Sequence, residues 1–135
     1  MPRKPLTIPK LKKKLDRIFS LYIRHRDSFD GENLECITCG KVVPIKEAHC
    51  GHHISRAVSP TRYSETNCAG QCAYDNVFRE GAQWLFGPAL RLKHGDYAYE
   101  QMLEESRQPW KWNREWLEER ITYYQDELKA MGVKY

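Results

Sequence analysis

The sequence contains no apolar run of the roughly 18 residues that a membrane-spanning helix requires, and its first ten residues hold no apolar stretch like that of a secretory signal. It also has no internal repeat and no low-complexity segment. Its composition excludes a collagen-like chain and a wholly disordered one. We therefore expect a globular protein of a reducing, cytoplasmic compartment, with no membrane partner.

Acidic residues are scarce at the N-terminus. Residues 1–26 contain nine Lys and Arg residues and one acid, whereas the rest of the chain has 13 basic and 17 acidic residues. The net charge of +4 therefore arises entirely from the N-terminal segment. Residues 1–9 include three prolines and predict a loose basic arm that reaches toward a polyanion.

A basic amphipathic helix is expected after this arm. From Lys10 onward, apolar residues recur at spacings of three, four and seven, at Leu11, Leu15, Ile18, Phe19, Tyr22 and Ile23. The other face carries Lys12, Lys13, Lys14, Arg17, Arg24 and Arg26. Such a face is either solvated surface or a surface that contacts the phosphates of DNA.

The middle of the chain predicts short strands followed by a short helix. Residues 42–45 and 48–54 have the length and composition of two small strands, and Pro44 restricts the first of them to a sheet edge. Residues 55–66 indicate a polar loop, and residues 67–79 indicate a turn that leads into a helix.

Three further helical segments are expected in the last third. They cover residues 84–92, interrupted at Gly87-Pro88, then residues 97–103, and finally residues 113–131. The aromatic face of the last segment suits either a protein core or a homodimer surface.

The five cysteines point to a metal site, because an odd number of cysteines in a reducing compartment is more typical of metal ligands than of disulfides. Cys36 and Cys39 form one Cys-x2-Cys pair, and Cys72 begins a second pair whose other member is Asp75. Zinc accepts a carboxylate oxygen at about 2.0–2.2 Å, so Asp75 is an admissible fourth ligand. Cys68 and Cys50 are the alternatives for that place. The competing interpretation is that these cysteines are small buried hydrophobes.

Histidines cluster between the cysteine pairs, in the segment His49-Cys-Gly-His52-His53-Ile-Ser-Arg56. Adjacent histidines at a strand end point in different directions, so that one can hold a divalent metal while its neighbour activates water. Asn76 follows Cys72 by four residues, and its amide oxygen would complete a Mg2+ site.

The order Cys-x2-Cys, His-His-Ile, Asn, Cys resembles that of HNH endonucleases with a zinc-stapled ββα-metal core, with Asn76 in the place of the final histidine. Over about residues 10–130 the chain is more similar to the phage lambda NinG (Rap) recombination endonucleases. That resemblance rests on residues 22–27, 36–40, 50–56, 62–63 and 67–72. It implies a structure-specific nuclease that cleaves D-loops or Holliday junctions in the host cytoplasm, with phage or host recombination proteins as partners.

The chain departs from the family pattern at two positions. The family usually has a cysteine where Asp75 stands and an aromatic residue where His53 stands, which favours His52 as the essential histidine. General HNH spacing favours His53 instead. We expect His52 to be essential, as base or ligand, with His53 in the complementary role.

These residues suggest a mechanism. One histidine would deprotonate a water molecule, while a single Mg2+ or Mn2+ ion held by the other histidine and Asn76 would stabilise the leaving 3′ oxygen. Asn67 would orient the base through a backbone or side-chain hydrogen bond. Arg56 and Arg62 would neutralise nearby phosphates, unless they are only surface charges.

We therefore expect an α+β fold in one compact unit. It would consist of a basic arm and helix in residues 1–32, an HNH-like core with a structural Zn2+ site in residues 33–82, and a helical extension in residues 83–135. Two other functions fit the same residues. One is a non-catalytic, zinc-stabilised DNA-binding module that grips phosphates through residues 3–26, and the other is an HNH homing or packaging endonuclease acting on duplex DNA.

Overall fold

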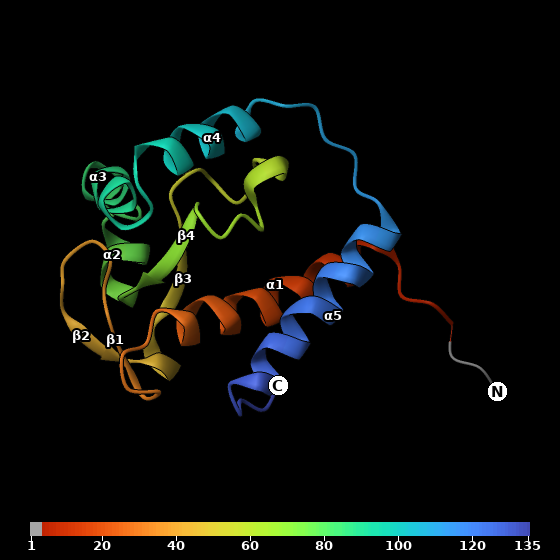
Figure 1. Cartoon of the computed structure of the whole chain (residues 1–135), viewed down its shortest axis with the longest axis horizontal. Helices are drawn as coiled ribbons and strands as arrows, with labels where there is room; N and C mark the ends of the chain where they lie inside the picture. The colour runs from red at the N-terminus through yellow and green to blue at the C-terminus, as the bar shows by residue number, and fades with distance from the viewer. Residues whose placement is uncertain (1–3) are drawn as a thin grey trace. The chain divides into compact units, whose positions relative to one another are not determined.

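The computed structural model describes residues 4–135, and these residues form an α+β fold (Figure 1). The elements are α1 (Ile8–Arg26), β1 (Asn33–Glu35), β2 (Val42–Pro44), β3 (His49–His52), β4 (Cys68–Gln71), α2 (Ala73–Phe78), α3 (Gln83–His94), α4 (Asp96–Ser106) and α5 (Arg114–Ala130), with one-turn 3₁₀ helices at Ile45–Glu47 and Ser59–Thr61. None of the helices within residues 4–135 has the length and apolar character needed to cross a membrane. The predicted mixture of helices and small strands is confirmed.

The described residues divide into two compact units whose limits differ from the predicted segments. One unit contains residues 4–22 and 111–135, and the other contains residues 23–110. The predicted basic helix is confirmed as α1, but its last turn belongs to the second unit together with the strands, α2, α3 and α4.

The first unit is built from α1 and α5, which lie side by side (Figure 1). The Tyr124 ring packs edge-on against Phe19, with ring centroids 5.1 Å apart, and also contacts Tyr22. The Asn113 side chain caps α5 by accepting a hydrogen bond from the Trp116 N–H. Tyr124 is therefore buried as core within this unit, whereas Trp116 on the same predicted face stays half-exposed.

The second unit contains two antiparallel strand pairs. β1 pairs with β2, placing Leu34 opposite Val43, and β3 pairs with β4, placing His52 opposite Cys68. The strands β2 and β3 were predicted, but β1 and β4 were not. β4 consists of Cys-Ala-Gly-Gln, which lacks the β-branched and aromatic residues that favour strands, so only its pairing with β3 makes it extended.

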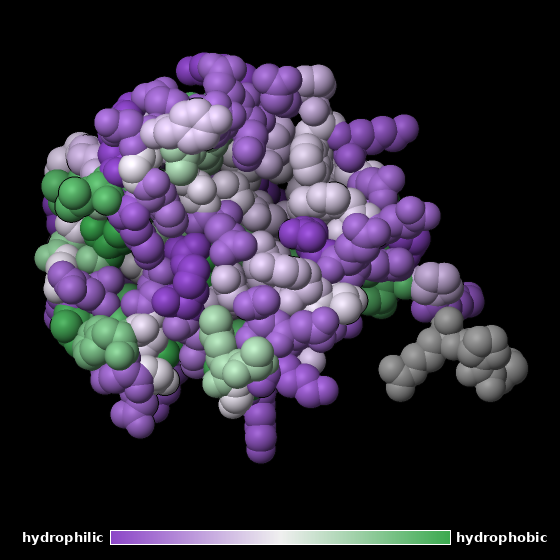
Figure 2. All heavy atoms as spheres, in the orientation of Figure 1, coloured by the Kyte–Doolittle hydropathy of each residue, from purple (hydrophilic) through white to green (hydrophobic). Residues whose placement is uncertain are grey.

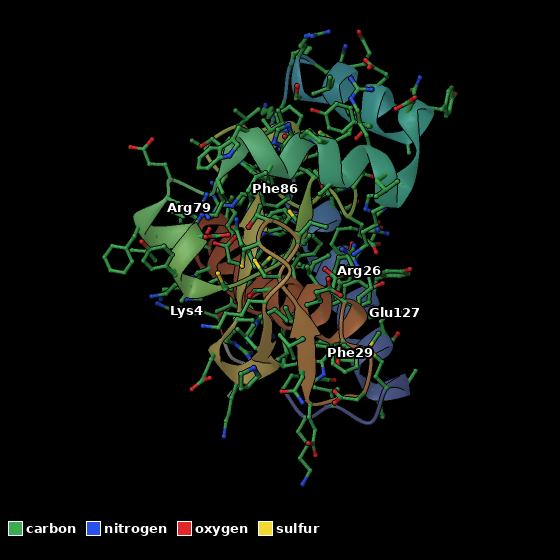
Figure 3. The ribbon with its side chains drawn as sticks, turned by 90° about the vertical axis from the view of Figure 1, so that its left-hand side faces the viewer. Lys4, Arg26, Phe29, Arg79, Phe86 and Glu127 are labelled. Carbon is green, nitrogen blue, oxygen red and sulfur yellow. The ribbon has the colours of Figure 1, made fainter. Side chains whose placement is uncertain are left out.

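The β3–β4 ribbon is covered closely on both faces because glycines lie at its centre. A Cβ atom on Gly51 would meet the Phe86 ring of α3 at 2.9 Å, and one on Gly70 would meet the Leu34 side chain at 2.7 Å. Figure 3 shows Phe86 on the α3 side of the strands. The ribbon therefore has two separate faces, and the histidine and cysteine side chains of β3 and β4 lie on one face or the other.

The helix α3 continues through Gly87-Pro88, where an interruption was predicted. Pro88 lacks the N–H that would have bonded to the Trp84 carbonyl and its ring crowds that carbonyl, but the helix continues on both sides of it. Gly87 lets α3 pack closely at this point, since a Cβ atom would lie 3.1 Å from both the His53 ring and the Tyr99 hydroxyl, tighter than an ordinary contact.

Candidate functional site

Three cysteines and one aspartate converge in the second unit. The ligand atoms of Cys36, Cys39, Cys72 and Asp75 all lie within 4.8 Å of one another, and the Cys39 and Cys72 sulfurs are 3.8 Å apart. The first two cysteines belong to the turn between β1 and β2, which Gly40 closes at a φ of 76°. The last two ligands come from the start of α2. Asp75, rather than Cys50 or Cys68, therefore lies with the three cysteines.

Backbone N–H groups point at two of these sulfurs. The Cys72 N–H donates to Cys36 Sγ at 3.2 Å, and the Asp75 N–H donates to Cys72 Sγ at 3.4 Å. Although burial alone would raise the pKa of Cys36, backbone N–H groups, the Cys72 N–H foremost, lower it below its ordinary value. Burial and the neighbouring sulfurs raise the pKa of Cys39 to about 12. Such a group of sulfur and carboxylate ligands suits a thiophilic ion such as zinc.

The Asp75 carboxylate is held in place by two donors. The Thr38 hydroxyl donates to Oδ2 at 2.6 Å, and the Arg79 guanidinium donates to Oδ1 at 3.1 Å. Burial would raise the pKa of Asp75, but these two donors outweigh it and keep the group ionised. The side chain thus has the charge and the fixed orientation that a metal ligand needs.

The strand histidines have separate partners. His53 donates from Nδ1 to the Gln83 amide oxygen at 2.7 Å, and its Nε2 accepts from the Tyr99 hydroxyl at 2.8 Å. The Gln83 amide nitrogen donates to the His52 carbonyl, which fixes the orientation of the amide. When the ring is neutral, the Gln83 contact therefore places the proton on Nδ1 and the lone pair on Nε2.

Asn67 holds the backbone on both sides of the polar loop. Its main-chain carbonyl accepts from the His53 N–H, while its fully buried side chain accepts from the Ile54 N–H and donates to the Ile54 and Thr61 carbonyls. Asn67 thus fixes the backbone immediately after the histidine pair.

Asn76 faces His49, the member of the histidine cluster to which the sequence assigned no role. Its amide nitrogen donates to His49 Nδ1 at 2.9 Å, between the first residue of β3 and the first turns of α2. Both side chains are half-exposed. The period of two along β3 places His49 on the face of the ribbon opposite Cys50 and His52.

His52 points to the other face of the ribbon. Its Nε2 donates to the Arg62 carbonyl at 2.8 Å, and one ring nitrogen lies within 4.8 Å of the Cys50 and Cys68 sulfurs. The adjacent histidines therefore point in different directions, and the structure pairs Asn76 with His49 where the sequence suggested His52 or His53. The reason is that Asn76 of α2 lies beside His49, the first residue of β3, whereas His52 is the last residue of that strand.

The basic residues predicted to contact DNA differ in their surroundings. Lys13, Lys14 and Arg17 line a hollow of about 330 Å³ together with Leu6 and Lys10. Lys12 lies 4.6 Å from the centre of the Trp112 ring. In the polar loop Arg56 is exposed, and the Arg62 guanidinium lies 5.7 Å from the Tyr63 ring.

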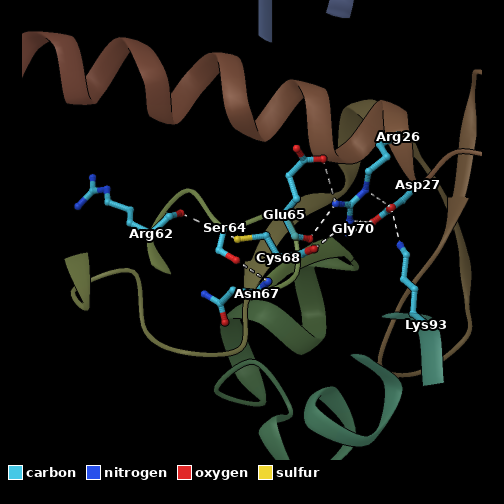
Figure 4. Close-up of polar contacts among 9 residues, drawn as sticks. All are labelled: Arg26, Asp27, Arg62, Ser64, Glu65, Asn67, Cys68, Gly70 and Lys93. Atoms are coloured by element: carbon cyan, nitrogen blue, oxygen red, sulfur yellow. Dashed lines mark hydrogen bonds and ion pairs between the residues drawn. The ribbon is translucent and has the colours of Figure 1, made fainter. Parts of the chain in front are cut away.

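Two of the predicted arginines stabilise the fold of the second unit. Arg24 donates to the Ile45 carbonyl. Arg26 donates to the Glu65 and Cys68 carbonyls and pairs with Asp27 (Figure 4). Burial lowers the pKa of Arg24. The helical pattern did not predict this internal role, and contact of these two residues with DNA stays a prediction.

Exposed aromatic residues lie next to the group formed by the three cysteines and Asp75. Tyr74, Phe78 and Trp84 are 63%, 75% and 61% exposed, and Arg79 lies over the Trp84 ring at 4.8 Å. Figure 3 shows Arg79 beside α2. Figure 2 shows hydrophobic residues gathered on the side of the molecule where Figure 1 places α2 and β2.

Comparison with known proteins gives one family. The sequence model of the family described as the bacteriophage lambda NinG protein matches residues 4–133. No curated protein and no solved structure gives a match.

Proposed function

The chain belongs to the NinG family, and we propose that it is a metal-dependent DNA endonuclease that cleaves branched recombination intermediates such as D-loops and Holliday junctions. The observation that carries this proposal is the half-exposed pair of His49 and Asn76, next to the cysteine group. In this pair an imidazole from a strand and an amide from a helix meet where a divalent ion and a phosphate have access.

The spacing of the two side chains suits a divalent ion. Neighbouring ligands of an octahedral Mg2+ ion at about 2.0–2.1 Å lie about 3 Å apart. The His49 ring nitrogen and the Asn76 amide are 2.9 Å apart, and rotating the amide would turn its oxygen toward the imidazole. Bound there, Mg2+ or Mn2+ would stabilise charge on the phosphate and on the leaving 3′ oxygen.

We assign the role of general base to His53, which follows His49 by four residues, about 13 Å along the extended chain, so that the ion and the base would contact different groups of the bound DNA. Gln83 keeps the proton on Nδ1, so the lone pair is at Nε2, which is the state that accepts a proton from water. The Tyr99 hydroxyl that now donates to Nε2 would have to yield its place to that water. Asn67 would serve as a positioning residue, because it holds the His53 N–H and both polar groups of Ile54.

DNA would be gripped mainly through phosphates. The hollow lined by Lys10, Lys13, Lys14 and Arg17 has the charge to bind a polyanion, and its Leu6 side chain supplies an apolar wall. Arg56 in the exposed loop would add a contact nearer the strand histidines. Arg62 is assigned the same role beside the Tyr63 ring.

The decisive experiment is cleavage of labelled Holliday junction, D-loop and linear duplex by the purified full chain, with Mg2+, with Mn2+ and with no added divalent ion. The last condition is preferable to a chelator, which would also strip zinc from the cysteines. We expect cutting that requires the added ion and is confined to branched DNA. Equal cutting of linear duplex would instead support a homing or packaging nuclease.

Variants separate chemistry from binding. His49→Ala and His53→Ala should abolish cleavage and leave the affinity for junctions within about twofold, whereas His25→Ala, outside the site, should cut normally. Tight binding without cutting in the wild type, under every metal condition, would contradict the proposal and leave the zinc-stabilised DNA-binding module as the function.

A further inference from the structure

A second group of metal-binding side chains lies on the ribbon face that the proposed nuclease site does not use. Cys50, His52 and Cys68 each present one ligand atom, and these atoms all lie within 4.8 Å of one another. In a tetrahedral zinc site with bonds of about 2.0–2.3 Å, neighbouring ligands lie about 3.5–3.8 Å apart. The three side chains therefore need only a small closure around an ion.

The register of the strands brings these residues together. Cys50 and His52 are two residues apart on β3 and point to the same face, and Cys68 is the direct cross-strand partner of His52. Cys68 is fully buried, whereas Cys50 and His52 are half-buried. The group is therefore closed to solvent on the side of Cys68 and reached by solvent on the side of Cys50 and His52.

The His52 ring already has the hydrogen bond that metal-bound histidines usually make. A carbonyl oxygen only accepts, so the bond to Arg62 places a proton on Nε2 and, in the neutral ring, the lone pair on Nδ1. In a zinc site Nδ1 would therefore bind the ion while Nε2 keeps its bond to the carbonyl, an arrangement that is typical of histidine ligands.

The backbone around the group is also held rigidly. Arg26 donates to the Cys68 carbonyl at 2.9 Å, and the Asp27 carboxylate accepts from the Gly70 N–H at 2.7 Å (Figure 4). β4 is therefore fixed to the end of α1 at Cys68 and again at Gly70. Rigid ligands lower the cost of ordering a metal site.

We propose that Cys50, His52 and Cys68 bind a second zinc ion, separate from the group of Cys36, Cys39, Cys72 and Asp75. Two thiolates and an imidazole are ligands that favour zinc over Mg2+ or Ca2+, and three protein ligands leave the fourth position for water. Since His52 and Cys68 flank the loop of residues 53–67, the ion would clamp both ends of that loop. His52 would thus act as a zinc ligand and not as the base.

Metal counting tests the proposal directly. The full chain, purified in reducing buffer with zinc and desalted, should contain two zinc ions per chain by mass spectrometry of the metal. Cys50→Ala and the matched variant Cys39→Ala should each retain one, and the double variant none. A wild-type content of one ion that Cys50→Ala does not change would overturn the proposal. The count does not depend on nuclease activity, and His53→Ala should keep both ions.

A cobalt titration of the wild type guards against variants that fail to fold. Co2+ bound to thiolates gives charge-transfer absorbance, which should rise until two equivalents are bound, with a smaller second contribution from the two-thiolate site. Saturation at one equivalent would contradict a second site. So would an unreduced intact mass lower by two hydrogens, with Cys50 and Cys68 joined, because that pair would then be a disulfide.

Discussion

The Asn67 carboxamide bonds the backbone of Ile54 in both directions, accepting from its N–H at 2.7 Å and donating to its carbonyl at 3.0 Å. Asn67→Ala should therefore leave buried backbone groups unpaired and lower the free energy of unfolding by about 2 to 3 kcal/mol. Urea denaturation measures this change. Asn76→Ala, at a half-exposed amide, is the matched control and should change stability by less than about 1 kcal/mol. If both substitutions lowered the free energy of unfolding by the same small amount, the hydrogen bonds of Asn67 would not be what stabilises the loop.

The Thr38 hydroxyl orients Asp75 in the cysteine group. Thr38→Val keeps the shape of the side chain but removes this donor, so the affinity for zinc should fall about 10- to 100-fold, as for other hydrogen-bond partners of metal ligands. Competition with a chromophoric chelator measures the affinity. Thr122→Val, at an exposed site on α5, should leave it unchanged. An unchanged affinity in Thr38→Val would mean that Asp75 does not bind the ion.

The Asp27 carboxyl makes the free energy of unfolding depend on pH in the acidic range. Burial would raise the pKa of its carboxyl, but hydrogen bonds and charges from Arg26 and Lys93 outweigh burial and leave the pKa below its ordinary value. A lowered folded-state pKa contributes stability that is present above the unfolded value, about 3.9, and is lost as the pH falls through the folded value.

Asp27→Asn tests this linkage. It should lower the free energy of unfolding by about 2 to 3 kcal/mol at pH 7, because Arg26 and Lys93 lose a charged partner with little exposure. Denaturation across pH should show the gap between wild type and variant narrowing below about pH 4. A gap that is constant with pH would contradict the assigned cause.

The basic hollow of α1 should set the salt dependence of DNA binding. Replacing Lys13 and Arg17 by Gln removes two charges, so the slope of log affinity against log salt should decrease by about 0.9 for each phosphate that is no longer neutralised. Fluorescence anisotropy over a range of salt measures it. Lys129→Gln, near the end of α5, is the control. A slope equal to that of the wild type would place the DNA elsewhere.

Local patterns in the sequence predicted much of the fold. The apolar periodicity of α1 and α5 and the spacing of Cys36, Cys39, Cys72 and Asp75 were sufficient, because these features act over a few residues or along one helix. β4 was missed because its extended conformation comes from its partner strand. The group of Cys50, His52 and Cys68 depends on the register between two strands. The pairing of His49 with Asn76 depends on where α2 lies against β3. No local pattern in the sequence specifies either arrangement.

The boundary between the two compact units falls inside α1, between Tyr22 and Ile23. The chain crosses this boundary once within a continuous helix and once in the segment of residues 107–113, most of which are exposed and outside regular secondary structure. A protease should therefore nick the chain first in that segment. The same boundary limits how the protein can be divided, because a fragment that begins at Ile23 would start in the middle of a helix. New chain ends introduced by circular permutation at residues 107–113 would instead leave every helix and strand whole.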